Sequence, residues 1–121
     1  MRDKKKTEDE LGRCYESAAF ALLNLDPALV AAGSPADWVL VHGRPRLSRP
    51  PFVRFGHAWL ENADVVFAAE QRVLVSKSLY YEIGQITDED RFTYTFEEAR
   101  ANILKSGHWG PWEGLEAGGE E

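Results

Sequence analysis

The stretch RFGHAWLENADVVFAA, residues 54 to 69, decides the expected fold of this chain. Its two halves are rich in aromatic and β-branched residues, which favour strands. The Asn62-Ala63-Asp64 segment between them is typical of a short turn. The stretch therefore predicts an antiparallel hairpin in which His57 lies some distance from the turn.

An apolar stripe at helical spacing precedes the hairpin and predicts a helix that ends at the Asp-Pro pair of positions 26 and 27. The members of the stripe are Leu11, Cys14, Ala18, Ala21, Leu22 and Leu25. Two starts are open for this helix: a capping box between Thr7 and Glu10, or a later start after Gly12. Only the later start would place Cys14 in the first helical turn.

The rest of the chain alternates further strand and helix patterns. Residues 37 to 43 predict a central strand, and residues 91 to 94 predict a brief one. Residues 76 to 86 predict a short helix with Ser76 or Ser78 as its N-cap. A final helix should open with a capping box at residues 95 to 98 and end at Gly107.

These patterns predict an α+β fold in which a small antiparallel sheet packs against an N-terminal, cysteine-bearing helix. One globular domain is expected over residues 11 to 113, because 121 residues with 44% apolar content suit a single core. Residues 1 to 10 predict a flexible charged arm. Residues 114 to 121 are rich in Gly and Glu and predict a disordered acidic tail.

Charge and cysteine content narrow the expected partners. The formal net charge of -6 disfavours nucleic acid and anionic membranes. No apolar run reaches the roughly twenty residues of a membrane span, and the single cysteine cannot form an internal disulfide, so a cytoplasmic protein is expected. We expect no cofactor or metal, because no glycine-rich phosphate loop and no close zinc-ligand spacing is present.

Two residues in these elements could carry chemistry. A cysteine nucleophile acts as a thiolate, and both a helix N-terminus and a neighbouring imidazole stabilise its charge. Cys14 on the first helix and His57 on the hairpin could supply the thiol and the imidazole. Their order along the chain is compatible with a cysteine hydrolase.

The segment Gly56-His57-Ala58-Trp59-Leu60-Glu61 resembles the histidine strand of transglutaminase-like proteins, with Cys14 and Ala18 on a helix upstream. The resemblance spans roughly residues 12 to 70. It implies a papain-like or transglutaminase-like core in a small bacterial or bacteriophage protein. The implied activity is that of a cysteine-dependent hydrolase or acyltransferase: Cys14 would attack the carbonyl carbon of an amide or isopeptide bond in a protein or peptide, and His57 would transfer the proton.

The resemblance also implies a third residue that orients the imidazole. The aspartate of the family pattern falls at about Ala68, which leaves Glu70 as the first candidate and Asp64, in the turn, as the second. The glutamine that papain-like enzymes place before the cysteine has no counterpart here. Backbone N–H groups at Cys14 would therefore have to hold the oxyanion.

Each candidate also has a structural interpretation. Cys14 can be a small buried apolar residue, His57 a core histidine, and Glu70 a solvent-facing acid. The second functional hypothesis is a non-catalytic protein-binding module on the same scaffold, with an arginine-rich loop or aromatic residues as the contact surface. The candidates for partner contact are Arg44, Arg46, Arg49, Trp59 and Trp109. The Trp-rich segment from residue 107 to 113 is either a strap over the core or one wall of a cleft.

Overall fold

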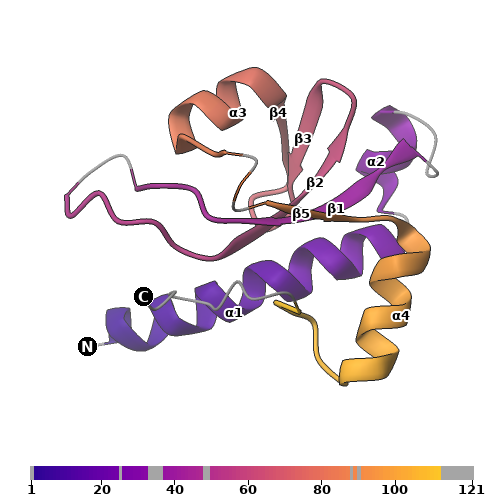
Figure 1. Cartoon of the computed structure of the whole chain (residues 1–121), viewed down its shortest axis with the longest axis horizontal. Helices are drawn as coiled ribbons and strands as arrows, with labels where there is room; N and C mark the ends of the chain where they lie inside the picture. The colour runs from indigo at the N-terminus through magenta and orange to yellow at the C-terminus, as the bar shows by residue number, and fades with distance from the viewer. Residues whose placement is uncertain are drawn as a thin grey trace.

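A computed structural model describes residues 2–24, 26–32, 37–47, 50–87, 89 and 91–112, with side chains described from residue 13 onward except at residue 32. It shows an antiparallel sheet with helices on both faces (Figure 1). The α+β class predicted from the sequence is therefore confirmed.

The sheet contains five strands in the order β4-β3-β2-β1-β5, and every neighbouring pair is antiparallel. The predicted hairpin provides the middle strand of the sheet and one neighbouring strand, with Leu60 opposite Phe67. The strands are β1 (Val39–Gly43), β2 (His57–Asn62), β3 (Val65–Ala68), β4 (Val73–Ser76) and β5 (Phe92–Tyr94). Strands thus form within the predicted segments 37 to 43 and 91 to 94, but they begin later, at Val39 and Phe92.

Helices cover the two faces of the sheet unequally. The long helix α1 (Arg2–Leu23) and the C-terminal helix α4 (Phe96–Ser106) pack on one face, while α3 (Lys77–Gly84) lies on the other (Figure 1). The short helix α2 (Pro27–Ala32) adds Leu29 to the core on the α1 side. We call the two sides of the sheet the α1 face and the α3 face.

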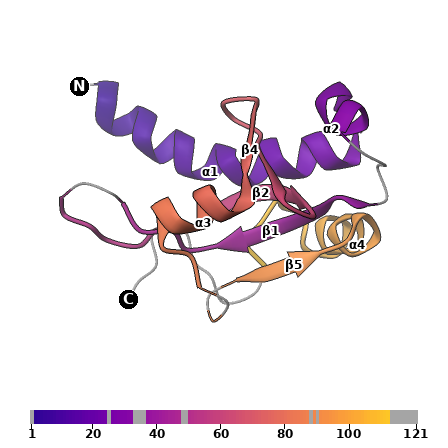
Figure 2. The same cartoon turned by 90° about the horizontal axis from the view of Figure 1, so that it is seen from above.

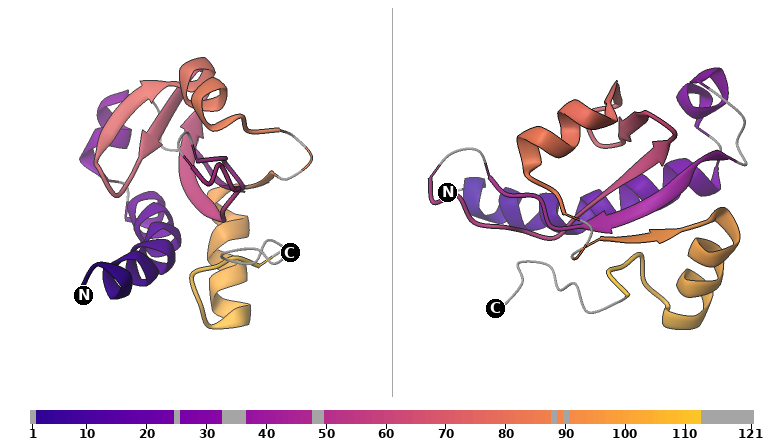
Figure 3. Two further views of the ribbon diagram at one scale, coloured as in Figure 1. Left: turned by 90° about the vertical axis from the view of Figure 1, so that its left-hand side faces the viewer. Right: turned by 45° about the horizontal axis from the view of Figure 1, so that its top comes forward.

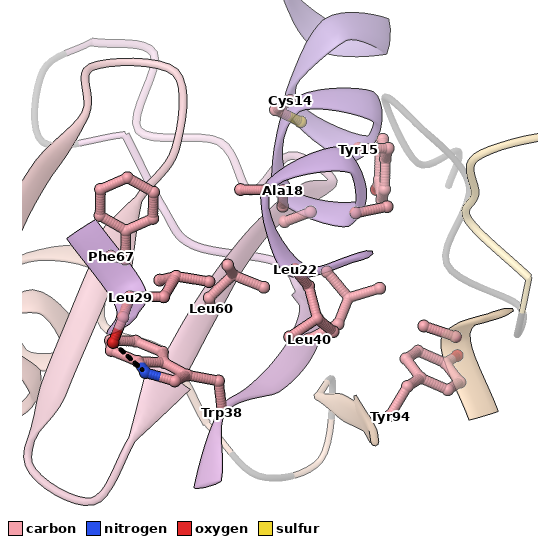
Figure 4. Close-up of a cluster of buried hydrophobic side chains, with 14 residues drawn as sticks. Cys14, Tyr15, Ala18, Leu22, Leu29, Trp38, Leu40, Leu60, Phe67 and Tyr94 are labelled. Carbon is pink, nitrogen blue, oxygen red and sulfur yellow. Dashed lines mark hydrogen bonds between the residues drawn. The ribbon is translucent and has the colours of Figure 1, made fainter. Parts of the chain in front are cut away.

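Each face has its own cluster of buried side chains. On the α1 face, residues from α1 pack against Leu40, Leu60 and Phe67, and the Trp38 indole donates a hydrogen bond to the Leu29 carbonyl at 3.1 Å (Figure 4). On the α3 face, Trp59 packs with Val41 and Val66. The two tryptophans are buried, as aromatic residues in strands should be, but they belong to different clusters.

The start of the first helix differs from both predicted starts. Helix α1 begins at Arg2, so the segment predicted as a flexible arm forms its first turns. Cys14 consequently lies about three turns inside the helix and not in its first turn. The early residues are charged, and charged residues with good helix propensity extend a helix without adding an apolar stripe.

Three helix ends agree with the sequence pattern, whereas two short elements have no clear pattern. Ser76 caps α3, and the Thr95 capping box with Glu98 opens α4, as predicted. Gly107 ends α4 in the left-handed conformation, with φ of 80°. Strand β4 and helix α2 were not predicted, because four and six residues are too short to show a clear period. The predicted tail at 114 to 121 lies outside the described residues.

Between β1 and β2 the chain forms an extended loop, described over residues 44–47 and 50–56, which projects past the sheet (Figure 2, Figure 3) and which we call the arm. Arg46 and Arg54 form an isolated antiparallel bridge, and the Leu47 amide donates to the Val53 carbonyl at 2.9 Å. The Arg46 amide also donates to the Gly84 carbonyl at 2.7 Å. The arm is therefore attached to the end of α3.

Candidate functional site

Cys14 lies in the core of the α1 face, where only 2% of its surface is exposed. Burial raises the pKa of the thiol to about 12, and the nearby Glu70 carboxylate raises it further. A backbone hydrogen bond from Ala58 offsets part of this increase. The thiol is therefore protonated near neutral pH, which is the opposite of the activation expected from the sequence.

His57 lies on the other face of the sheet. Side chains alternate along β2, so Ala58 and Leu60 pack with α1 whereas His57 and Trp59 point toward α3. The His57 ring centroid is 5.6 Å from that of Phe55 and 6.0 Å from that of Trp59. Burial lowers the pKa of His57 to about 4, so its imidazole is neutral near neutral pH.

The structure does not bring the predicted catalytic residues together, because the sheet separates Cys14 from His57. Glu70 lies in the turn after β3, on the same side as Cys14, where it lines a polar cavity of about 480 Å³ with Arg13 and Ser17. It cannot orient the His57 ring from there. Asp64, the second candidate, lies in the β2–β3 turn, and its carbonyl accepts a hydrogen bond from the Lys77 amide.

A pocket of about 240 Å³ is present on the α3 face, between the arm and α3. Its lining is mainly apolar and aromatic, and it includes His57. We call it the groove, and its lining residues are Pro45, Arg46, Leu47, Phe55, His57, Tyr80, Ile83, Gly84 and Ile86.

Exposed apolar side chains also lie on the arm and on α3, and among them Ile83 lines the groove. Phe52 and Val53 are exposed on the arm, and Leu79 and Ile83 on α3. Ile83 both lines the groove and has 58% of its surface exposed. Apolar side chains that stay in water beside an apolar pocket are typical of a binding surface.

The arginines of the arm serve mainly to hold its shape. Arg46 donates from Nε to the Phe52 carbonyl at 2.7 Å and from Nη1 to the Gln85 side chain at 3.3 Å. Arg54 donates from Nη1 to the Arg44 and Gln85 carbonyls, each at 2.8 Å. These acceptors are neutral, and no carboxylate that the structure describes pairs with either guanidinium. Arg49 lies outside the described residues.

A buried polar network fixes the position of α3. The sequence patterns did not predict this network. Glu61, which is 5% exposed, accepts hydrogen bonds from the Trp59 indole at 2.8 Å and from the Tyr81 hydroxyl, and pairs with Lys77 at 3.3 Å. Arg91 donates to the Tyr81 hydroxyl at 2.8 Å. Burial and the Glu61 carboxylate raise the pKa of Tyr81 to about 12. The sequence contains one signal for this network: Glu61 is an acid within a largely apolar strand, and a buried acid needs partners.

The two C-terminal tryptophans form a strap over the α1 face, in agreement with one of the two interpretations of that segment. Trp109 packs near Phe20, with ring centroids 6.4 Å apart, and Trp112 lies 4.9 Å from the ring of His42. Trp109 is therefore remote from the groove. Trp59 is fully buried under the groove and cannot itself contact a partner.

Comparisons with family models, with curated proteins and with solved structures found no match for this chain. The resemblance to papain-like and transglutaminase-like cores therefore stays a prediction. None of the helices described is both long and apolar enough to cross a membrane. Within the described residues, no three His, Cys, Asp or Glu side chains gather as a set of metal ligands. The class defined by fold and site is an α+β domain with an apolar groove on one face of its sheet.

Proposed function

We propose that this protein is a non-catalytic binding module that holds a segment of another protein in the groove on its α3 face. The observation that carries this proposal is the groove itself. Its two walls come from separate parts of the chain, the arm and α3, its lining is mainly apolar, and Ile83 in that lining is exposed to water. Water-exposed apolar surface of this kind is stabilised when a partner covers it.

The position of Cys14 favours this function over a cysteine hydrolase. A nucleophile and its base must approach to hydrogen-bond distance, and here the sheet lies between them. Burial also disfavours the thiolate that would have to attack a carbonyl carbon. His57 instead contributes an uncharged aromatic ring to the groove.

The size of the groove suits one anchoring side chain. Pockets for drug-sized molecules occupy about 300 to 1,000 Å³, whereas this one has about 240 Å³. Protein interfaces often depend on a few large side chains that enter well-packed pockets of this kind. The groove therefore fits a protein segment better than a cofactor.

The walls of the groove are held before any partner binds. One backbone hydrogen bond joins Arg46 to Gly84, and the Glu61 network holds α3 against β2. A preorganised surface loses little conformational entropy on binding, so more of the contact energy appears as affinity.

Photo-crosslinking in the native cells tests the proposal. A benzoylphenylalanine residue placed at Ile83 should crosslink to a protein partner, and the same residue at Leu104 should not. Leu104 is a matched control because it is also an exposed aliphatic residue on a helix, but it lies on α4. With the partner then purified, Ile83→Ser should weaken binding about tenfold, which corresponds to about 1.4 kcal/mol. Equal crosslinking at both sites, or unchanged affinity of the Ser variant, would contradict the proposal.

A further inference from the structure

We infer that the groove selects a segment in which a large apolar side chain is followed or preceded closely by a carboxylate. This inference rests on the proposed function and names the chemistry of its partner. The apolar side chain enters the pocket, and the carboxylate meets Arg46 at the rim.

The apolar part of the inference follows from the pocket lining. Phe55, His57 and Tyr80 present rings, and Ile83 and Ile86 add aliphatic surface. His57 adds no charge near neutral pH, since burial keeps its imidazole neutral. A charged side chain in this pocket would lose its hydration without gaining a partner, whereas an apolar one gains contacts on several sides.

The acidic part follows from Arg46, which lines the same pocket and is exposed. Its guanidinium carries five N–H donors, and two of them are used, one by the Phe52 carbonyl of the arm and one by the Gln85 side chain at the end of α3. Both acceptors are neutral, so the positive charge is not offset by any carboxylate that the structure describes. An arginine held in this way is prepared to bind a carboxylate.

The charge of the remaining protein makes this position selective. With a formal net charge of -6, the molecule as a whole repels an acidic partner. The arm is the place where arginines concentrate, so an acidic partner segment is attracted there and is oriented as it approaches. Because Arg46 belongs to the pocket wall, the acid and the apolar side chain must lie within a few residues of each other in the partner.

Two fluorescent probes of similar shape test this inference on the full chain. Anilinonaphthalene sulfonate has an apolar ring system and one anionic group, which stands in for the partner's carboxylate, and phenylnaphthylamine is its neutral parent. Both probes should bind, and Ile83→Ser should weaken both. Arg46→Gln should weaken the anionic probe about three- to tenfold and change the neutral probe less than about twofold.

Matched variants complete the test. Arg100→Gln removes an exposed arginine from α4 and should leave both probes unchanged. Arg46→Lys keeps the charge and should retain part of the preference, and only the anionic probe should weaken between about 0.05 and 0.5 M salt.

The outcomes separate this inference from the proposed function. If both probes bind through Ile83 but Arg46→Gln affects them equally, the groove stands and the acidic requirement is overturned. If Ile83→Ser weakens the binding of neither probe, the groove is not a binding site. That result would contradict both the proposed function and this inference.

Discussion

Burial determines the chemistry of Cys14. The thiol lies in the interior of a 22-residue helix, against the α1 face of the sheet. A helix N-terminus would stabilise a thiolate, but the field of the helix ends acts mainly within the first and last turns. Desolvation is therefore the dominant effect, and it favours the neutral thiol.

Alkylation of the native protein tests this description of Cys14. Iodoacetamide at pH 8 should modify Cys14 at least about a hundredfold more slowly than free cysteine, because the thiolate is scarce and the sulfur is buried. In denaturant the rate should become ordinary. His57→Ala should change neither rate. Fast native labelling that slows in His57→Ala would instead support the Cys14–His57 pair.

Acid should destabilise the protein through His42. This side chain is 1% exposed, and burial lowers its pKa to about 3, compared with an ordinary value of 6.5. Between these two values the unfolded chain binds a proton that the native state does not, so stability decreases as pH falls below about 6.5. The expected contribution is about 1.4 kcal/mol per pH unit between pH 6 and 4.

Urea unfolding at several pH values measures this contribution. Leucine has a volume similar to that of histidine and cannot titrate. As the pH falls, the stability of His42→Leu should therefore decrease less steeply than that of the unchanged protein, by about 1.4 kcal/mol per pH unit. His57 is present in both proteins and serves as an internal control for the remaining acid sensitivity. Parallel pH profiles for the two proteins would show that His42 is not buried as a neutral ring.

At the scale of elements, the position of α3 depends on one carboxylate. Glu61 is the shared acceptor for Trp59, Tyr81 and Lys77. Its removal would leave buried donors without an acceptor, which costs more than the net value of the hydrogen bonds themselves.

Glu61→Ala should therefore lower the free energy of unfolding by about 2 to 4 kcal/mol. The same variant should weaken binding of the neutral probe, since α3 is a wall of the groove. Glu82→Ala removes an exposed acid from the same helix and should cost less than about 0.5 kcal/mol. Equal effects of the two substitutions, measured by chemical denaturation, would mean that the Glu61 network does not hold α3.

At the scale of the whole molecule, the sheet separates two layers with different roles. The α1 face is covered by α1, α4 and the strap, and it holds most of the buried side chains. The α3 face is covered by one eight-residue helix, so part of its apolar surface remains accessible as the groove (Figure 1). Stability thus comes mainly from one layer, and the proposed binding site lies on the other.

Two tryptophans can separate these roles. Trp38→Ala and Trp59→Ala should each lower the free energy of unfolding by about 3 to 5 kcal/mol, because both side chains are fully buried. Only Trp59 contacts His57 and Tyr80, so only its removal should also weaken probe binding. Denaturation and probe titration of both variants test this. A loss of binding in the Trp38 variant at temperatures where it stays folded would contradict the separation of layers.

Features that depend on a few neighbouring residues could be predicted from the sequence. The central hairpin, the Ser76 cap and the Thr95 capping box are formed by contacts within short segments, and the structure contains them. Local patterns of this kind reflect the period of the backbone, which any fold must respect.

The helix that covers each face of β2 could not be predicted from local patterns. Alternation places Ala58 and His57 on opposite sides, but it does not say whether Cys14 packs beneath one or the other. That choice depends on the packing of α1 and α3, which are separated by about fifty residues. Cys14 and His57 therefore lie on opposite faces of the sheet, and the groove lies where the arm meets α3. Both results depend on long-range packing that no local pattern encodes.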